Sequence, residues 1–504
     1  MTESPVRPGP VYLTVLVIST CGLVYELVAG ALASYLLGDT VTQFSLVIGM
    51  YLTAMGAGAW LSKFVEKGLA RRFVEVEIAV AFLGGFSAPI LSFAFVSPRW
   101  FHPVFYGLVF SIGVLVGLEI PLMLRLLRRS VAFKDLVAQV LTFDYLGALA
   151  ASLLFPLVFV PRLGLFRTSL LFGLLNAAVA FASIRLFRSE IGAPGGLLAK
   201  AAAVTVLLLA GFASADRLSE LAEEQQYADE VLFARSSAYQ RVVLTRNRAG
   251  FQLFLNGHLQ FSSVDEYRYH EALVHPAFAV APGARRIAVL GGGDGLAVRE
   301  ILRHPSVASV TLVDLDPMVT RLARENPLFV SLNGGSLRSP KVTVVNDDAM
   351  TWLEKGSDRF DLVFVDFPDP NGFAVGKLYT KRFYTLLGRR LSPDGAFAVQ
   401  STSPLFARKS FWIIDRTIAA AGFATRPYHA AVPSFGEWGF VLAAPKSFDV
   451  PPRLLSGLRY LSDETLPALF SFGPDMARWA EAPVNRLHDQ ALVRTYESEW
   501  RKFE

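Results

Sequence analysis

The sequence is poor in cysteine and in charged residues. Its single cysteine among 504 residues, Cys21, excludes an internal disulfide and leaves the redox compartment undefined. Charged residues make up only 18% of the chain, whereas 53% of it is hydrophobic. The formal net charge is +5, but the basic residues form no stripe interleaved with aromatic residues. The composition therefore does not favour nucleic-acid binding, and no internal repeat or low-complexity segment is evident.

What stands out is a glycine-rich turn at Ile287–Val298, I-A-V-L-G-G-G-D-G-L-A-V. A buried strand leads into glycines that let a ligand approach the backbone closely, with Asp294 between them. About 20 residues on, the strand Ser309–Val313 ends at Asp314, the position that holds ribose hydroxyls in nucleotide-binding βαβ units. Most proteins that use adenosylmethionine must accept its carboxylate where Asp294 stands. The turn therefore predicts an adenosine-bearing ligand with a cationic tail. The glycines are Gly291, Gly292, Gly293 and Gly295.

A second acidic motif lies downstream at Val363–Pro370, V-F-V-D-F-P-D-P. The run Asp361–Val365 is predicted as a buried parallel strand, which places Asp366 and Asp369 just past its carboxyl end. Ligands of open α/β sheets bind at that edge. A cap for the next helix or a metal site is the alternative for such a pair. Their place beside the glycine-rich turn favours a binding or catalytic role.

Five motifs in order carry a resemblance to a known family. Leu253–Glu271, L-F-L-N-G-H-L-Q-F-S-S-V-D-E-Y-R-Y-H-E, is followed by G-G-G-D-G, V-D-L-D, N-D-D-A and D-F-P-D-P. From about Ser237 to about Ala444 the chain resembles the polyamine aminopropyltransferases, that is, the spermidine synthases. The resemblance implies transfer of an aminopropyl group from decarboxylated S-adenosylmethionine to putrescine or a similar polyamine. The products would be spermidine and 5'-methylthioadenosine.

The resemblance also implies site residues, with the decarboxylated S-adenosylmethionine as co-substrate, no other cofactor and no metal. Gln240 would contact the thioadenosine, Asp314 its ribose, and the pair Asp348 and Ala349 its adenine. Asp366 and Asp369 would be catalytic, the first as proton acceptor. The residues expected to bind the co-substrate are Gln240, Gly291, Gly293, Asp314, Asp348 and Ala349. Those expected to bind the polyamine are Tyr269, His270, Asp294, Asp366, Asp369 and Glu437, with Gln260 and Tyr379 on further pocket positions.

The chemistry explains why acids dominate this set. A diamine arrives protonated, with an ammonium pKa near that of lysine, roughly 10.4, and becomes a nucleophile only when a base removes a proton. Carboxylates attract the dication, and one of them can take that proton. The freed nitrogen attacks the methylene next to the sulfonium in line and expels neutral methylthioadenosine. The leaving group already carries positive charge, so no metal is required.

Two departures from the family pattern affect the polyamine end of the site. Gly372 is followed by Phe373 where soluble members usually have a glycine and a proline. The familiar P-T-Y segment reads Pro433-Ser434-Phe435, so a tyrosine that would hydrogen-bond the amine is missing. We hypothesise that Glu437 replaces that contact, although Phe435 and Trp438 are equally typical of core residues. The preferred length of the diamine stays open.

Upstream of about Ala215 the chain consists of long apolar runs. Most reach the roughly 20 apolar residues that cross a bilayer, and the first is too long for a cleaved signal peptide. The last run is short and contains Lys200, so six or eight crossings are alternatives to seven. We therefore expect a multi-pass transmembrane helical domain over residues 1–215. The expected spans are Val11–Gly38, Val41–Ser62, Val74–Val96, Val104–Leu124, Leu136–Val160, Leu165–Ile184 and Leu197–Ala213.

The short loops predict the orientation of these spans in the cell (inner) membrane. Every second loop is basic, whereas the alternate loops offer little beyond Arg99 and Arg162. The positive-inside rule places the basic loops and the amino terminus in the cytoplasm. Seven crossings then put the enzyme domain outside, in conflict with a cytoplasmic supply of co-substrate, so its side stays open. The basic loop residues are Lys63, Lys67, Arg71, Arg72, Arg125, Arg128, Arg129, Lys134, Arg185 and Arg188.

Three carboxylates fall well inside the apolar runs: Glu26, Glu119 and Asp144. A charge at bilayer depth is costly and usually faces a cavity or a partner. One interpretation is hydrogen bonding between helices by protonated acids. The other is a cation route or docking site for polyamines.

The rest of the chain is predicted as α/β. Residues 216–263 read as a helical linker and a small β-sheet, with strand-like runs Val231–Arg235, Arg241–Arg246 and Phe251–Leu255 and a tight turn at Asn256-Gly257. Residues 264–445 alternate strands and helices, typical of a Rossmann-like, methyltransferase-type doubly wound parallel sheet. The tail 446–504 is predicted to be helical and is assigned to packing or an interface. By resemblance we expect a homodimer.

Two rival functions belong to other classes. An S-adenosylmethionine-dependent methyltransferase on the same fold would have to place its cofactor carboxylate near Asp294. A membrane polyamine transporter or sensor would use the adenosyl domain for binding alone, which the presence of both Asp366 and Asp369 disfavours.

Overall fold

The chain folds as two compact units, Met1–Val231 and Leu232–Glu504, in a computed structural model that describes residues 8–37, 40–128 and 133–502. The boundary falls in strand β1 (Glu230–Ser236), after the predicted linker helix α10 (Ala215–Gln226). Two residues named above, Gly38 and Arg129, lie outside the described residues.

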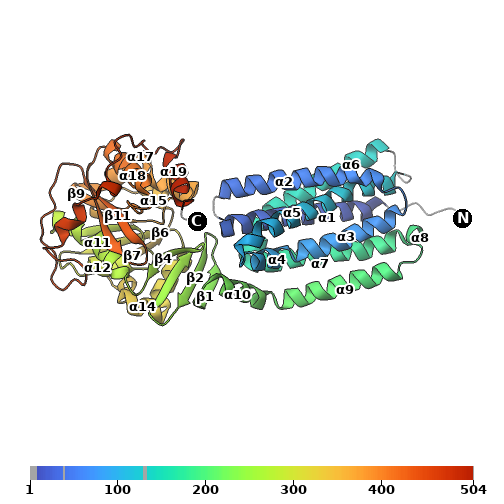
Figure 1. Cartoon of the computed structure of the whole chain (residues 1–504), viewed down its shortest axis with the longest axis horizontal. Coiled ribbons are helices and arrows are strands. Elements are labelled where there is room, and N and C mark those ends of the chain that lie inside the picture. Colours follow the sequence, from blue (N-terminus) through green and yellow to red (C-terminus); the bar gives the residue numbers. More distant parts are fainter. Residues whose placement is uncertain (1–7, 38–39, 129–132, 503–504) are drawn as a thin grey trace. The chain divides into compact units, whose positions relative to one another are not determined.

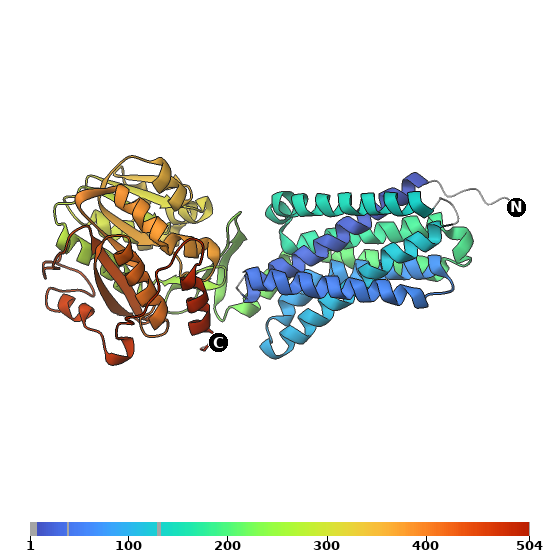
Figure 2. The ribbon, with the colours of Figure 1, turned by 90° about the horizontal axis from the view of Figure 1, so that it is seen from above.

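The first unit is a bundle of long apolar helices lying side by side (Figures 1 and 2). Among the described residues, five helical runs are long and apolar enough to cross a membrane, or six if α3 and α4, bent by 45°, count as one span. The long helices are α1 (Pro8–Leu37), α2 (Thr40–Leu61), α3 (Leu69–Gly85) with α4 (Ser87–Ala94), α5 (Pro98–Leu127), α6 (Phe133–Leu154), α7 (Val160–Leu186) and α9 (Gly195–Ala213). Short turns η1 (Ser62–Phe64), η2 (Phe155–Phe159) and α8 (Arg188–Ile191) connect them.

One of the five runs is too long for a single pass. Lys134–Leu186 has 53 residues, which as one helix would extend about 80 Å, against about 30 Å for the hydrocarbon core of a bilayer. It bends at Gly164, where φ is 72° and ψ is 176°. Leu136 and Phe187, at its two ends, pack in one apolar cluster, whereas Phe155, from its middle, packs in another. The run is a hairpin, so the described chain passes along the bundle seven times.

The last helix, α9, runs the length of the bundle. Leu197, near its start, packs with Ile184 at the end of α7, and Leu208, near its end, packs with Leu170 at the start of α7. Helix α9 is thus antiparallel to α7. Because Val11 of α1 packs at the same end as the end of α7, the chain leaves the bundle at the end opposite to the one where α1 begins.

The second unit begins with a four-stranded sheet in the order β1-β2-β3-β4. Strands β1, β2 (Arg241–Arg246) and β3 (Phe251–Leu255) match the predicted runs, and β4 (His258–Ser262) is an addition. The predicted tight turn is confirmed, because Asn256 and Gly257 both have positive φ, 51° and 81°.

A seven-stranded sheet in the order β10-β11-β9-β8-β5-β6-β7 forms the core of this unit. Strands β7, β6, β5, β8 and β9 are parallel neighbours, as predicted, but β11 and β10 pair antiparallel beside β9. The expectation of a parallel sheet was wrong there, because a tight turn at Gly436, with φ of 79°, joins the two edge strands directly. The bounds are β5 (Arg286–Gly291), β6 (Ser309–Asp314), β7 (Val342–Asn346), β8 (Phe360–Asp366), β9 (Leu391–Gln400), β10 (Ala424–Val432) and β11 (Gly436–Ala444).

Helices cover both faces of this sheet. Along β5, Ile287 and Val289 pack into one apolar cluster, whereas Ala288 and Leu290 pack into another on the opposite face. Helices α11 and α12 contribute to the first cluster, and α17 and α18 to the second. The bounds are α11 (Glu266–Val280), α12 (Leu296–Leu302), α13 (Pro317–Glu325), α14 (Pro327–Asn333), η3 (Ser336–Arg338), α15 (Ala349–Lys355), α16 (Phe373–Gly376), η4 (Lys377–Tyr379), α17 (Lys381–Arg389) and α18 (Arg408–Ala420).

The tail is mostly not helical, contrary to the prediction. Within 446–504 the described α-helix is α19 (Ala491–Trp500), preceded by the 3-10 turns η5 (Leu466–Phe470) and η6 (Pro474–Met476). Prolines recur through the segment before α19 and remove backbone donors that a helix needs. They are Pro451, Pro452, Pro467, Pro474 and Pro483.

Candidate active site

The candidate site lies where β5 and β8 run side by side. This is the switch point of the sheet, because the chain continues from β5 to β6 on one side and reaches β8 on the other. Gly291 at the end of β5 is in register with Asp366 at the end of β8. A Cβ on Gly292 would lie 2.9 Å from Asp366 Oδ2, and one on Gly293 would lie 2.6 Å from Asp314 Oδ2. Only glycine lets the turn sit between these two carboxyls.

On the side predicted for the nucleoside, Asp314 ends β6. Its Oδ2 accepts a hydrogen bond from Gly293 N at 3.0 Å and its Oδ1 one from Asp316 N at 2.9 Å. Gln240 lies nearby, because its Nε2 donates to Asp316 Oδ2 at 3.0 Å. The structure thus brings Gln240 next to the end of β6. Asp316 was not predicted, and it also caps α13 by accepting from Met318 N.

The pair predicted at the adenine begins the neighbouring helix α15. Asp348 Oδ1 accepts from Thr351 N at 2.9 Å, and Ala349 is buried behind it. Lys377 Nζ lies 2.6 Å from Asp348 Oδ2. Although partial burial opposes it, the hydrogen bond from Lys377 holds the pKa of Asp348 below its usual value. Asp348 therefore acts first as a helix cap and an ion-pair partner of a lysine that the sequence did not single out.

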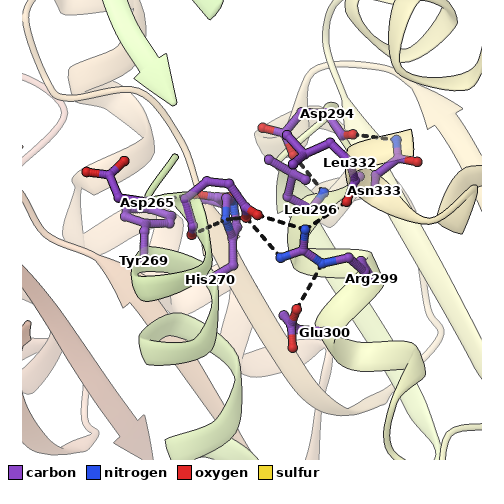
Figure 3. A network of polar contacts seen from close by, with 12 residues as sticks. Asp265, Tyr269, His270, Asp294, Leu296, Arg299, Glu300, Leu332 and Asn333 are labelled. Carbon is purple, nitrogen blue, oxygen red and sulfur yellow. Dashed lines mark hydrogen bonds and ion pairs between the residues drawn. The ribbon is translucent and has the colours of Figure 1, made fainter. Parts of the chain in front are cut away.

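His270 is fixed by a buried network (Figure 3). Its Nδ1 lies 2.8 Å from the Glu266 backbone oxygen and 2.9 Å from Glu266 Oε2. Arg299 donates from both terminal nitrogens to the Glu266 carboxylate, at 2.8 and 2.9 Å. Burial alone would lower the pKa of His270, but the Glu266 hydrogen bond raises it above its usual value. When it is protonated, His270 balances part of the charge of Asp294 and Asp366, with which it interacts electrostatically.

Asp294 and Asp366 form the acidic wall opposite this histidine. Asp294 Oδ1 accepts from Leu296 N at 2.8 Å, and Asp366 Oδ1 accepts from the Tyr269 hydroxyl at 2.5 Å. Both carboxyls keep some exposed surface. Burial raises the pKa of Asp294 to about 6 and raises that of Asp366, with His270 acting in the opposite direction. The wall can thus hold negative charge or a proton near neutral pH.

Asp369 is held by three donors from two segments, the end of β9 with the residues that follow it, and α19. Thr402 Oγ1 donates to its Oδ2 at 2.9 Å, Tyr496 Oη to the same oxygen at 2.8 Å, and Gln400 Nε2 to its Oδ1 at 3.3 Å. Gln400 Nε2 also donates to Tyr379, whose hydroxyl donates to the Pro368 carbonyl at 3.1 Å. The predicted Tyr379 therefore supports the acidic loop from beneath. Burial raises the pKa of Asp369 to about 6.

Glu437 and Gln260, which were also predicted to lie near the polyamine, have their described hydrogen-bond partners outside the acid pair. Glu437 Oε2 lies 2.8 Å from His429 Nδ1, and among the described contacts it is not joined to the acid pair. Trp438 is 9% exposed and packs in a tilted arrangement against Phe435, which in turn contacts Tyr269. Trp438 is thus a core residue, and Phe435 is a partly buried ring that packs against the core. Gln260 Nε2 donates to the His258 carbonyl in its own strand.

Besides Asp316 and Lys377, three residues around the acidic loop were missed by the sequence reasoning. Gln400 ends β9 beside the acid pair, and a polar residue at the end of a buried strand was an available signal. Thr402 has φ of 56°, which is unusual for a β-branched residue and which the sequence does not reveal. Tyr496 lies in α19, 127 residues after Asp369, and no local sequence pattern predicts this contact.

The match to known proteins extends over both units. A family model described as Spermine/spermidine synthase domain matches residues 266–450. A polyamine aminopropyltransferase of Leptospira interrogans is 51% identical over 97% of this chain and 98% of its own length. Polyamine aminopropyltransferase 1 of Ralstonia nicotianae is 53% identical over 99% of this chain and 97% of its own length.

The chain belongs to the polyamine aminopropyltransferase family. It is an aminopropyl-transferring enzyme that uses decarboxylated S-adenosylmethionine as co-substrate. A solved spermidine synthase in complex with the transition state analogue AdoDATO is 26% identical, covering 48% of this chain and 86% of its own, with a TM-score of 0.45. The methyltransferase rival is set aside by this membership.

The activity of this aminopropyltransferase should fall as the pH falls through about 6. The pKa values of Asp294, Asp314 and Asp369 are all raised to about 6 by burial. In the proposed roles, Asp294 and Asp369 attract cations only when ionised, and an ionised Asp314 is the better acceptor for ribose hydroxyls. We expect kcat/KM to rise from pH 5 to 7 and then level off. Initial rates at constant ionic strength measure this, and a flat profile down to pH 5 would contradict it.

The contribution of these carboxyls to the stability of the fold should change with pH in the direction opposite to the activity. The three carboxyls have folded pKa values above the ordinary 3.8, so the folded protein binds their protons more tightly than the unfolded chain does. Their contribution therefore favours folding below pH 4 and is lost as the pH rises through 6.

Proposed function

We propose that the acidic edge between β5 and β8 is where the aminopropyl group passes from decarboxylated S-adenosylmethionine to putrescine. The observation that carries this proposal is the grouping of Asp294, Asp366 and Asp369, all partly exposed, at the switch point of the sheet. Two substrates that both bear positive charge need such a slot, because water alone would not bring two cations together. The glycine-rich turn and Asp314 would hold the nucleoside half.

Asp366 is the proposed proton acceptor. It receives one described hydrogen bond, from Tyr269, whereas Asp369 receives three and is thereby fixed in place. Asp366 would take a proton from the attacking ammonium, and the freed nitrogen would form a bond to the aminopropyl carbon as the carbon–sulfur bond breaks. Methylthioadenosine leaves uncharged, spermidine forms, and the proton passes on to solvent. Asp369 and Asp294 would orient the ammonium groups of the two substrates.

Product analysis tests this function. Purified full-length protein with putrescine and decarboxylated S-adenosylmethionine should release methylthioadenosine and spermidine in equal amounts. With intact S-adenosylmethionine we expect neither product. Release of S-adenosylhomocysteine with a methylated amine would contradict the proposal and favour a methyltransferase.

We propose that Tyr496 takes over the missing tyrosine of the Pro433-Ser434-Phe435 segment. Its hydroxyl reaches Asp369 from α19, outside the residues that the family model matches. Tyr496→Phe should raise the KM for putrescine about tenfold, because loss of a hydrogen bond to a charged group costs about 1.5–3 kcal/mol, and change the KM for the co-substrate little. Tyr460→Phe, in the same tail, serves as control, and equal KM values for Tyr496→Phe and the control would contradict the role.

We further propose that the helical unit spans the cell (inner) membrane with its amino terminus in the cytoplasm. Large apolar side chains on its outer surface support this, among them Leu52, Leu157 and Val206, which are 58, 71 and 63% exposed. Seven passes and cytoplasmic basic loops put the end of α9 outside, whereas the co-substrate is expected inside. A reporter fused after Glu504 decides between the two sides.

The homodimer stays a proposal by resemblance. Mass measurement of the detergent-solubilised full chain tests it, and a monomeric mass would contradict it.

A further inference from the structure

Two buried carboxyls lie inside the helical unit, far in sequence from the acidic edge formed by Asp294, Asp366 and Asp369. Glu77 of α3 is 0% exposed and Glu119 of α5 is 2% exposed. Each has a buried oxygen, Oε1, with no hydrogen-bond partner among the described residues. The two side chains interact electrostatically, and Glu119 also interacts with Asp144 of α6. Buried polar atoms in folded proteins usually have a hydrogen-bond partner, so each of these oxygens calls for a proton, a water molecule or a ligand.

The surroundings of Glu77 are polar but uncharged. Asn176 Nδ2 of α7 donates to Glu77 Oε2 at 2.8 Å, and the Tyr25 hydroxyl of α1 donates to Asn176 Oδ1 at 2.9 Å. A second phenol, Tyr51 of α2, donates to the Gly22 carbonyl at 2.8 Å. The first two hydrogen bonds connect α3, α7 and α1, the third connects α2 to α1, and none of them reaches the buried Oε1 of Glu77.

No described cation neutralises these acids. The described ion pairs of the bundle lie elsewhere: Arg71 and Arg72 pair with Glu75, and Arg167 pairs with Asp216. Arg125 donates to two backbone carbonyls. An ionised carboxylate without a partner in such an interior is very costly. Each acid therefore needs a proton or another cation as companion.

The groups around these two acids favour an ammonium ion over a metal ion. Within the described residues, no group of three or more histidine, cysteine, aspartate or glutamate side chains is arranged to hold a metal ion. A primary ammonium instead carries three donors and is bound well by carboxyl oxygens with aromatic rings nearby. The unpartnered oxygens of Glu77 and Glu119 have this chemistry. Both carboxyls interact electrostatically with Tyr25, and Glu119 also does so with Tyr51. Hydrogen bonding between helices by protonated acids would not leave both Oε1 atoms unpartnered.

We propose that Glu77 and Glu119 form a second amine site, which takes the protonated primary amine of a polyamine in exchange for a proton. The proposal rests on the proposed function for its choice of amine. The bundle would then bind the polyamine substrate or product of the reaction at the acidic edge, and would not serve only as a membrane anchor. Of the acids predicted to matter in the apolar runs, Glu119 belongs to this site, and Asp144 lies within electrostatic reach of it.

Binding stoichiometry of the full-length protein in detergent tests this site. With radiolabelled putrescine at equilibrium, the wild type should bind about two molecules per chain and Glu77→Gln/Glu119→Gln about one. Gln keeps the acceptor for Asn176, so the fold should be retained, which a melting curve checks. Glu75→Gln, two residues away on α3 and paired with exposed arginines, is the matched control and should bind two. In weak buffer, the second putrescine should release about one proton, and this release should vanish in the double variant.

The outcomes separate this inference from the proposed function. Glu77→Gln/Glu119→Gln should keep wild-type turnover at saturating substrate. Asp366→Asn/Asp369→Asn should lose turnover but still bind the one putrescine whose binding releases a proton. Full putrescine binding by the folded Glu77→Gln/Glu119→Gln protein would overturn the second site, as would binding of radiolabelled sodium in place of putrescine. Normal turnover in Asp366→Asn/Asp369→Asn would overturn the proposed function alone.

Discussion

Replacing Asp366 with asparagine should lower kcat about a thousandfold and leave the KM for the co-substrate nearly unchanged. General-base catalysis is worth about 10²–10⁴-fold, and asparagine removes the proposed proton acceptor while its side-chain oxygen can still accept from the Tyr269 hydroxyl. Steady-state release of methylthioadenosine at saturating putrescine measures the change. The loss should shrink at high pH, where a growing share of the amine is already unprotonated.

The control for this experiment is Asp358→Asn. Asp358 lies just before β8, is 71% exposed and pairs with Arg286, so its replacement alters the same strand region and the same net charge away from the site. We expect wild-type kcat for Asp358→Asn. A loss of less than tenfold for Asp366→Asn would assign proton removal to another group, with Asp369 next in line.

Replacing Asp294 with asparagine should weaken discrimination between decarboxylated and intact S-adenosylmethionine. Two unit charges about 4 Å apart near a protein surface interact by about 4 kcal/mol, and desolvation offsets part of this. We therefore expect the KM for the decarboxylated form to rise about a hundredfold, while inhibition by the intact form becomes stronger. The ratio of these two constants is the measurement.

The control for Asp294→Asn is Asp347→Asn, next to the predicted adenine pair. Asp347 makes a local hydrogen bond to Asp348 N, and its replacement should leave the ratio unchanged. An unchanged ratio in Asp294→Asn would contradict the assignment of the cationic tail to this residue.

Much of the site was predictable because its chemistry is local. A buried strand followed by glycines and an acid fixes a turn at a sheet edge, and Asp314, Asp366 and Asp369 each follow a strand that the sequence shows clearly. Parallel strands bring such ends together without further information. The helical nature of the chain before about Ala215 was equally predictable, because long apolar runs are visible in the sequence. That these helices cross a membrane stays a prediction.

The other parts of the site depend on contacts between residues distant in the sequence. Tyr496 reaches Asp369 from α19, after a tail that contains several prolines. Thr402 donates to Asp369 from a backbone conformation that a β-branched residue disfavours. Glu77 was not singled out because it lies two residues from the partly exposed Glu75, near the start of an apolar run. Pairing of Glu437 with His429 depends on the register of β10 and β11, which the sequence does not specify.

Single-turnover release of methylthioadenosine by Asp294→Asn/Asp366→Asn/Asp369→Asn tests most directly whether negative charge at the sheet edge drives the reaction. With a melting temperature at least equal to that of the wild type, as expected when raised-pKa acids are neutralised, the triple variant should form no detectable methylthioadenosine or spermidine. Product formation by the folded triple variant at a rate near that of the wild type would contradict the account.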